Sequence, residues 1–220
     1  MFEEQIIKKV GQEIKNKTWG VTEQFLEVHD VVLVDGKPKI DRIDSEKGDG
    51  TVIAYLPIKD ESFHLAIYLD SKSDFEIKGV GTEPYNSVYF RVTSDKLSVT
   101  ELSSMTTLNA TENWDKGEKK KFGNSVHKFS SVMFEPNPEP DEFTDKIKKL
   151  LDFLEQDKVG VKRLVDNADG YVQVAMKFHN GNTMLGGPSL DKEIIKRMND
   201  LNLAVDFDLY ADGNSFKEEQ

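Results

Sequence analysis

The sequence has 220 residues, a formal net charge of −11 and no cysteine. A hydrophobic fraction of 37% is enough for a folded core and too high for a disordered chain of this charge. The missing cysteines exclude disulfides, thiolate metal sites and a thiol nucleophile. Acidic residues exceed basic ones in both halves, so the basic surface of a nucleic-acid-binding protein is absent and we expect no nucleic-acid partner.

The N-terminal segment MFEEQIIKKVGQEIK is charged and amphipathic, unlike the basic stretch and apolar run of a signal peptide. No segment contains the roughly 20 consecutive apolar residues that cross a bilayer. We therefore expect no membrane association and a cytoplasmic location.

Residues 1–82 are predicted to form a helix followed by an antiparallel meander. Ile6, Ile7, Val10 and Ile14 recur at spacings of three and four, which is typical of one face of a helix. The pattern then alternates with a period of two, which predicts strands over residues 24–34, 50–58, 63–69 and 75–80. A helix covering one face of such a sheet is cystatin-like in order, by analogy of fold alone.

Gly79, Gly81 and Pro84 predict a boundary between this domain and a second α+β domain over residues 83–220. A capping box at Ser98 and Glu101 marks one helix start of the second domain, and Asp141 marks another. The alternating and helical patterns predict a ferredoxin-like β-α-β-α-β-α-β order, with strands over 87–94, 125–136, 171–178 and 203–211 and a last helix over 191–201. The fold class is therefore α+β.

The segment VYFRVTSDKLSVTELSSMTTLNATENWDKGE resembles the opening of an uncharacterised bacterial family, domain-of-unknown-function family 4279. It has the strand, the acidic helix start, the small-residue loop and the closing Lys116-Gly117-Glu118 of that family. The helix LDKEIIKRMNDLN and a strand ending Asp208-Leu209-Tyr210 match its closing segment, so the resemblance covers about residues 86–211. It implies a fold, and no activity, because the family carries none that is established.

Familiar metal and nucleotide motifs are missing. His29, His64, His127 and His179 occur singly, without an H-x-x-H or H-E-x-x-H partner. Histidines far apart in sequence can converge, but we expect these to be solvent-facing or satisfied by hydrogen bonds, and we expect no metal. The glycines at 79–81 and 181–187 fit neither G-x-G-x-x-G nor a Walker sequence, so we expect no cofactor.

The candidate binding residues lie in two places. Asp206, Asp208 and Tyr210 alternate along the last predicted strand and project to one face, as acid–base or Mg²⁺-binding carboxylates would and as any solvated strand face does. Trp114, Lys116 and Lys119 lie in a polar connection, where a Trp is either buried or an anchor for a partner.

Three functions are compatible with these patterns. The leading hypothesis is a non-catalytic protein-binding module of the immunity or antitoxin type, whose acidic surface neutralises a basic partner protein. The alternatives are a hydrolase-like enzyme with a site assembled from strand Asp and His residues, and a structural or regulatory module that dimerises through a sheet edge. The oligomeric state does not follow from the sequence.

Overall fold

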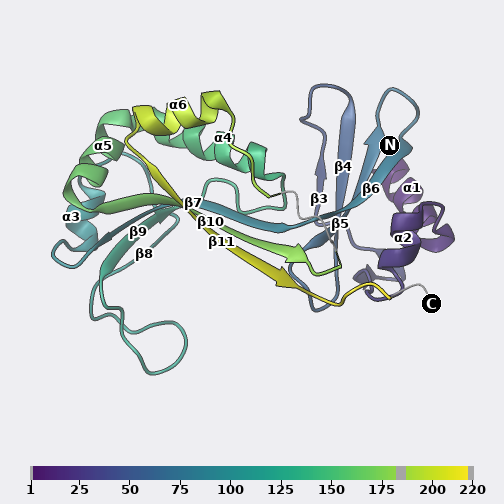
Figure 1. Cartoon of the computed structure of the whole chain (residues 1–220), viewed down its shortest axis with the longest axis horizontal. Helices are drawn as coiled ribbons and strands as arrows, with labels where there is room; N and C mark the ends of the chain where they lie inside the picture. Colours follow the sequence, from purple (N-terminus) through teal and green to yellow (C-terminus); the bar gives the residue numbers. More distant parts are fainter. Residues whose placement is uncertain (1, 182–186, 218–220) are drawn as a thin grey trace.

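A computed structural model describes residues 2–181 and 187–217 as an α+β fold (Figure 1). Residues 182–186, within the glycine-rich stretch noted above, lie outside the described residues. No helix in the described ranges is long and apolar enough to span a bilayer. Eighteen elements follow in chain order: α1 Phe2–Asn16, α2 Gly20–Phe25, β1 Leu33–Val34, β2 Lys37–Pro38, β3 Arg42–Asp44, β4 Thr51–Pro57, β5 His64–Asp70, β6 Glu76–Glu83, β7 Tyr85–Ser94, α3 Val99–Ser103, β8 Glu112–Trp114, β9 Ser130–Phe134, α4 Phe143–Leu154, a 3-10 turn η1 Glu155–Asp157, α5 Lys158–Asn167, β10 Asp169–His179, α6 Lys192–Asp200 and β11 Ala204–Asp212.

The N-terminal half is an antiparallel sheet in the order β3-β4-β5-β6, packed against α1 and α2. Alternate residues of β4 and β5 are buried with Ile6 and Val10 of α1, because neither the helix nor the sheet can cover its apolar side alone. Ile14 packs at the edge of this cluster, whereas Ile7 is 39% exposed. The predicted helix and the strands over 50–58, 63–69 and 75–80 are confirmed.

The predicted strand over residues 24–34 is wrong at its start. Residues 20–25 form α2, the backbone amide of His29 still bonds to the Phe25 carbonyl, and only residues 33–34 pair as a strand. The buried residues here are Thr22, Phe25 and His29, at helical spacings of three and four. Two of these three are polar, so the apolar pattern did not show the helical period.

The C-terminal half is a mixed five-stranded sheet in the order β11-β10-β7-β9-β8. β10 and β11 run parallel and are joined through α6, while the other neighbours are antiparallel. Helix α4 packs on β7, α5 on β10, and α6 on α4, so the helices lie together on one side of the sheet (Figure 1). Ser98 and Glu101 form the predicted capping box at the start of α3.

Helix α5 was not predicted from the sequence, because it follows α4 after a single 3-10 turn and contains Gly160. A Cβ on Gly160 would collide with Asp157 and with the backbone of Thr106, so the glycine permits a close approach that a larger residue would prevent. The Asp157 side chain accepts the Gly160 amide at 2.9 Å and so caps this helix. The helical signal was thus weakened at the position where the packing needs a glycine.

The predicted strand over residues 125–136 is too long. Only Ser130–Phe134 pairs as β9, and the preceding polar connection contributes the short edge strand β8. Residues 115–129 form a long loop with one isolated bridge between Lys119 and Val126. In Figure 1 this loop extends to the side of the sheet opposite α4 and α6.

The apolar core divides near Pro84, where β6 ends and β7 begins. One cluster contains residues from β4, β5 and the first two helices, and a second contains residues from β7 to α6. A small third cluster lies on the other face of β4 and β5 and contains Ile53, Tyr55 and Ala66. Division into domains 1–82 and 83–220 remains a prediction, because ion pairs and the C-terminal segment also join the two halves. Phe216, near the C-terminus, packs against the N-terminal cluster.

Candidate functional site

One face of the five-stranded sheet has no helix packed on it within the described residues, and its side chains form the candidate site. The strand register places Tyr171 opposite Arg91, and Gln173 between Tyr89 and Asp206. Because side chains alternate across a strand, these residues share the face opposite the one that packs against the helices. In the same register Met133 lies opposite Arg91, and Trp114, Asp208 and Tyr210 also lie on this face. We call it the open sheet face.

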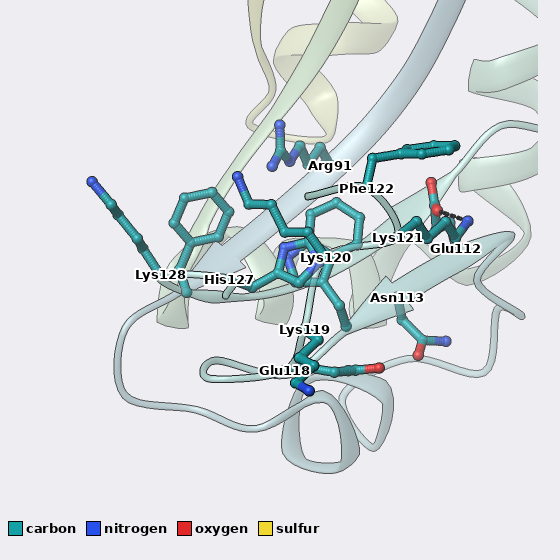
Figure 2. Close-up of a pocket in the computed structure, with 12 residues that line it drawn as sticks. Arg91, Glu112, Asn113, Glu118, Lys119, Lys120, Lys121, Phe122, His127 and Lys128 are labelled. Atoms are coloured by element: carbon teal, nitrogen blue, oxygen red, sulfur yellow. Dashed lines mark hydrogen bonds and ion pairs between the residues drawn. The ribbon is translucent and has the colours of Figure 1, made fainter. Parts of the chain in front are cut away.

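At the β8 edge of the open sheet face, aromatic and basic side chains surround a pocket of about 540 Å³. The rings of Trp114 and His127 stack with centroids 4.6 Å apart. The Arg91 guanidinium carbon lies 5.3 Å from the Trp114 ring centroid and 5.4 Å from that of Phe129, within the range of cation–π attraction. Figure 2 shows the Arg91 side chain at this pocket together with side chains of the 115–129 loop. The arrangement fixes an arginine between two rings.

The loop beside this pocket carries most of the local positive charge. Lys119, Lys120, Lys121 and Lys128 line the pocket, and Lys121 pairs with Glu112 at 2.5 Å (Figure 2). Phe122, at the same rim, is 88% exposed. Its ring is a single exposed apolar group among lysines, which by itself does not mark an interface.

Lys116, the remaining candidate from this connection, does not line the pocket. Its backbone amide donates to the Ser130 hydroxyl at 3.1 Å, and its ammonium donates to the Asp95 carbonyl at 3.1 Å. These contacts hold the start of the loop against β9 and the end of β7. Lys116 therefore positions the loop.

The opposite edge of the open sheet face is acidic. Asp206, Asp208 and Tyr210 are exposed along β11, and Tyr210 is 53% exposed. Gln173 donates to the Asp208 carboxylate at 3.3 Å, which links the edge strand to the centre of the face. Burial raises the pKa of Tyr89, with Arg91 opposing the shift, so this phenol stays neutral at physiological pH. The face thus runs from basic at β8, through tyrosines, to acidic at β11.

Within the described residues, these three side chains lie away from His179, the histidine of the neighbouring strand. In the parallel register His179 lies opposite Asp212, four residues beyond Asp208, which is about 13 Å along a strand. Asp206, Asp208 and Tyr210 do not line any of the described pockets. Their exposure on an edge strand fits a contact surface.

Another Asp–His pair lies at a second pocket, of about 350 Å³, between the two halves. The His64 Nε2 is 3.2 Å from the Asp41 carboxylate, and burial lowers the pKa of His64. Ser62 lines the same pocket, but its buried hydroxyl has no hydrogen-bond partner in the described part of the chain. A nucleophile activated by this histidine would need that bond, so Asp41 and His64 form a carboxylate–imidazole pair without a bonded nucleophile.

An acidic cluster joins the two halves near the start of α4. Carboxylate oxygens of Asp44, Asp141 and Asp145 lie within 4.8 Å of one another, the spacing of cation ligands. The Lys47 ammonium occupies this cluster, 3.2 Å from Asp44, 3.7 Å from Asp141 and hydrogen-bonded to Asp145. Burial opposes its charge, but hydrogen bonds to Asp145 and Glu142 more than offset this and raise the pKa of Lys47. A lysine thus supplies the positive charge that a metal would bring.

Burial also perturbs two ionisable groups near this junction. It raises the pKa of Glu83 to about 8, and the Asn86 side-chain amide donates to that carboxyl at 3.0 Å. It lowers the pKa of Lys146 to about 8, and the Lys146 amine donates to the Asn137 carbonyl at 2.8 Å. Neither group had a local signal in the sequence, because each lies in an ordinary strand or helix pattern.

The structure brings Trp114 and Lys119 together at the pocket, and places Asp206, Asp208 and Tyr210 at the far edge of the same sheet face. Sequence reasoning missed Tyr89, Arg91 and Tyr171, which lie between them. In the sequence these three residues are the non-apolar ones that alternate with apolar residues in the predicted strands over 87–94 and 171–178. Which face of a strand lacks a helix could not be read from that alternation.

Two of the four histidines, His29 and His179, are buried and lie in hydrogen-bonding contact with each other. His29 and His179 are 7% and 1% exposed, and their Nε2 atoms are 2.9 Å apart. They are 150 residues apart in the chain, so no local spacing could indicate the contact.

Comparison with known proteins gives one match. No curated protein and no solved structure matches the chain. The family model described as "Domain of unknown function (DUF4279)" matches residues 83–212, which begins at the end of β6 and includes every strand of the five-stranded sheet. Because this match covers more than half of the 220 residues, the chain belongs to the DUF4279 family.

Proposed function

We propose that this chain is a non-catalytic protein-binding module of the immunity or antitoxin type, and that it binds its partner with the open sheet face. The observation that carries the proposal is the sheet itself: its helices lie on one side, and the other side presents Trp114, Arg91, Tyr89 and Tyr171. Trp, Tyr and Arg are the residues that most often dominate binding energy at protein interfaces.

The geometry of these residues supports a preformed surface. Their backbones lie in paired strands, so little conformational entropy remains to be lost on binding. Arg91 is already held by its two aromatic neighbours, and Gln173 is tied to the edge strand. A rigid surface with aromatic anchors is what a tight inhibitor requires.

The charge of the chain favours a cationic partner. The net charge is −11, and Asp206 and Asp208 add exposed carboxylates to the open sheet face itself. A lysine- or arginine-rich patch of a partner would form ion pairs with these carboxylates, while acidic groups of the partner would pair with the lysines of the 115–129 loop. The long-range attraction would accelerate encounter and weaken with added salt.

Site-specific photo-crosslinking in living cells tests the proposal. A photoreactive benzoylphenylalanine would replace Tyr171 on the open sheet face and, in a control variant, Ile195, which is 53% exposed on α6. We expect a defined crosslinked species from position 171 and none from position 195. Crosslinks from position 195 alone, or from both positions equally, would contradict binding through the sheet face.

The hydrolase alternative rests on the Asp41–His64 pair beside Ser62. It predicts that a fluorophosphonate probe labels Ser62 and that Ser62→Ala abolishes the labelling. The missing hydrogen bond to Ser62 leads us to expect no labelling.

The dimerisation alternative would use the free edge of β11, which ends the five-stranded sheet. Exposed aspartates on an edge strand oppose self-pairing through like-charge repulsion. We therefore expect sedimentation velocity to show a monomer at neutral pH, and a concentration-dependent dimer would favour this alternative.

A further inference from the structure

Two buried histidines from opposite halves of the chain meet a backbone carbonyl beside the C-terminal segment. His29 follows α2, and His179 is the last residue of β10. Their Nε2 atoms are 2.9 Å apart, and the His179 Nε2 is 2.8 Å from the carbonyl oxygen of Asn214. The His29 Nε2 and the Asn214 carbonyl oxygen, two atoms with lone pairs, therefore both lie within 2.9 Å of the His179 Nε2.

Hydrogen bonding alone does not satisfy these three atoms well. A carbonyl oxygen only accepts, so the Asn214 contact requires a proton on the His179 Nε2. That proton points at the Asn214 carbonyl, so it cannot also point directly at the His29 Nε2. If the His29 Nε2 carried a proton as well, the two protons would face each other. A cation between the three atoms would satisfy all of them at once.

The distances suit a small divalent transition metal. Bonds of 2.0–2.1 Å to Zn²⁺ in a tetrahedral site place neighbouring ligand atoms about 3.3 Å apart. The two separations in the structure, 2.9 Å and 2.8 Å, need to open by only a few tenths of an ångström. Imidazole nitrogens are preferred ligands of Zn²⁺, Ni²⁺ and Cu²⁺.

The backbone around the pair has glycine where a side chain would block this convergence. A Cβ on Gly213, which has φ +82°, would lie 2.7 Å from the Phe63 ring and 3.2 Å from the His29 ring. A Cβ on Gly181 would collide with the His179 ring. Both glycines therefore permit the close backbone approach that carries the Asn214 carbonyl to the histidines.

An aromatic shell fixes the rings and limits water. Phe25, Phe63 and Phe216 have ring centroids 5.2, 5.3 and 4.7 Å from that of His179. An apolar shell of this kind orients ligand rings and strengthens the electrostatic attraction of a bound ion.

A neighbouring pocket of about 340 Å³ gives access from solvent on the His29 side. Its lining includes His29 and Asn214 together with four carboxylate side chains and one ammonium, those of Glu27, Asp30, Asp60, Glu61 and Lys59. This excess of negative charge would draw in a cation, and water or a carboxylate from this lining could complete four-coordination.

We propose that His29, His179 and the Asn214 carbonyl bind one divalent transition metal of the Zn²⁺ class, which ties the C-terminal segment to the N-terminal half. The site is separate from the open sheet face, so the test of metal binding does not depend on the proposed protein-binding function. The bound ion stabilises the folded chain because the unfolded chain does not hold the three ligands together.

Calorimetric titration of tag-free, EDTA-dialysed full chain with Zn²⁺ tests the site, with the visible absorption of bound Co²⁺ as a second readout of coordination. We expect one ion per chain, and at least a tenfold weaker affinity in His29→Gln and in His179→Gln. Zn²⁺ should also raise the melting temperature of the wild type and leave that of His29→Gln unchanged.

Control variants distinguish binding at this site from binding of Zn²⁺ elsewhere on the chain. His64→Gln and His127→Gln remove histidines outside the site and should bind Zn²⁺ as the wild type does. Asn214→Ala should also bind it, because the ligand there is a backbone carbonyl. If His179→Gln does not fold, as judged by circular dichroism, His29→Gln decides the outcome. No saturable binding by the wild type, or unchanged binding by His29→Gln, would overturn the proposal.

Discussion

Glu83 offers a direct test of the electrostatics at the junction between the two sheets. This carboxyl ends β6, is 9% exposed and has a pKa raised by burial to about 8. In the unfolded chain the same group ionises near its ordinary value of 4.5. Between these two values the folded state binds one more proton than the unfolded state, so folding stability falls as the pH rises.

The magnitude follows from the width of that window. Each pH unit inside it costs about 1.4 kcal/mol, so stability should fall by about 3 kcal/mol between pH 5 and pH 7.5 from this group alone. Glu83→Gln keeps the shape and can still accept the hydrogen bond from Asn86, but it cannot ionise. The variant should therefore match the wild type at pH 5 and exceed its stability by up to about 3 kcal/mol at pH 7.5.

Urea denaturation followed by circular dichroism at both pH values measures this difference. The control variant is Glu76→Gln, at the exposed start of the same strand, which should leave the pH dependence unchanged. Lys146 does not interfere, because its pKa of about 8 keeps it mostly charged over this range. Equal pH dependence of Glu83→Gln and the wild type would refute the reasoning.

Two further stability predictions follow from the ion pairs and caps. Arg42→Ala removes the partner 2.9 Å from the fully buried carboxylate of Asp141 and should cost about 2–4 kcal/mol by urea denaturation. Arg163→Ala, at an exposed position of α5, should cost less than about 0.5 kcal/mol, and equal losses would contradict the role of the buried pair. Asp157→Ala removes the cap of α5 and should cost about 1–2 kcal/mol at pH 7 in the same assay. Because backbone hydrogen bonds lower the pKa of Asp157 to about 2, its contribution should be present above pH 4 and disappear as the pH falls through 2, and a loss already complete at pH 4 would exclude this explanation.

The sequence predicts the regular elements whose apolar residues keep a strict period. Helices α1, α4 and α6 and strands β4, β5 and β7 were found because their buried residues recur every three to four or every two positions. Helix α2 was missed because it is short and polar Thr22 shares its buried face with Phe25, and α5 because Gly160 interrupts its pattern.

The candidate site was predictable only in fragments. Trp114 and Asp208 were visible as a loop aromatic and an alternating strand carboxylate, but the strand order that puts them on one sheet face is a long-range property. The same holds for His29 and His179, which meet only because the C-terminal half returns to the N-terminal one. Local patterns carry no information about such contacts.

The open sheet face as the binding surface is the central claim, and titration of the crosslinked partner against purified variants tests it most directly. We expect Tyr171→Ala and Arg91→Ala to weaken the affinity at least tenfold, and Ile195→Ala on α6 to leave it unchanged. The double variant Asp206→Asn/Asp208→Asn should reduce the dependence of the affinity on salt. Unchanged affinity in both Tyr171→Ala and Arg91→Ala, with loss in Ile195→Ala, would place the interface on the helices and contradict the account.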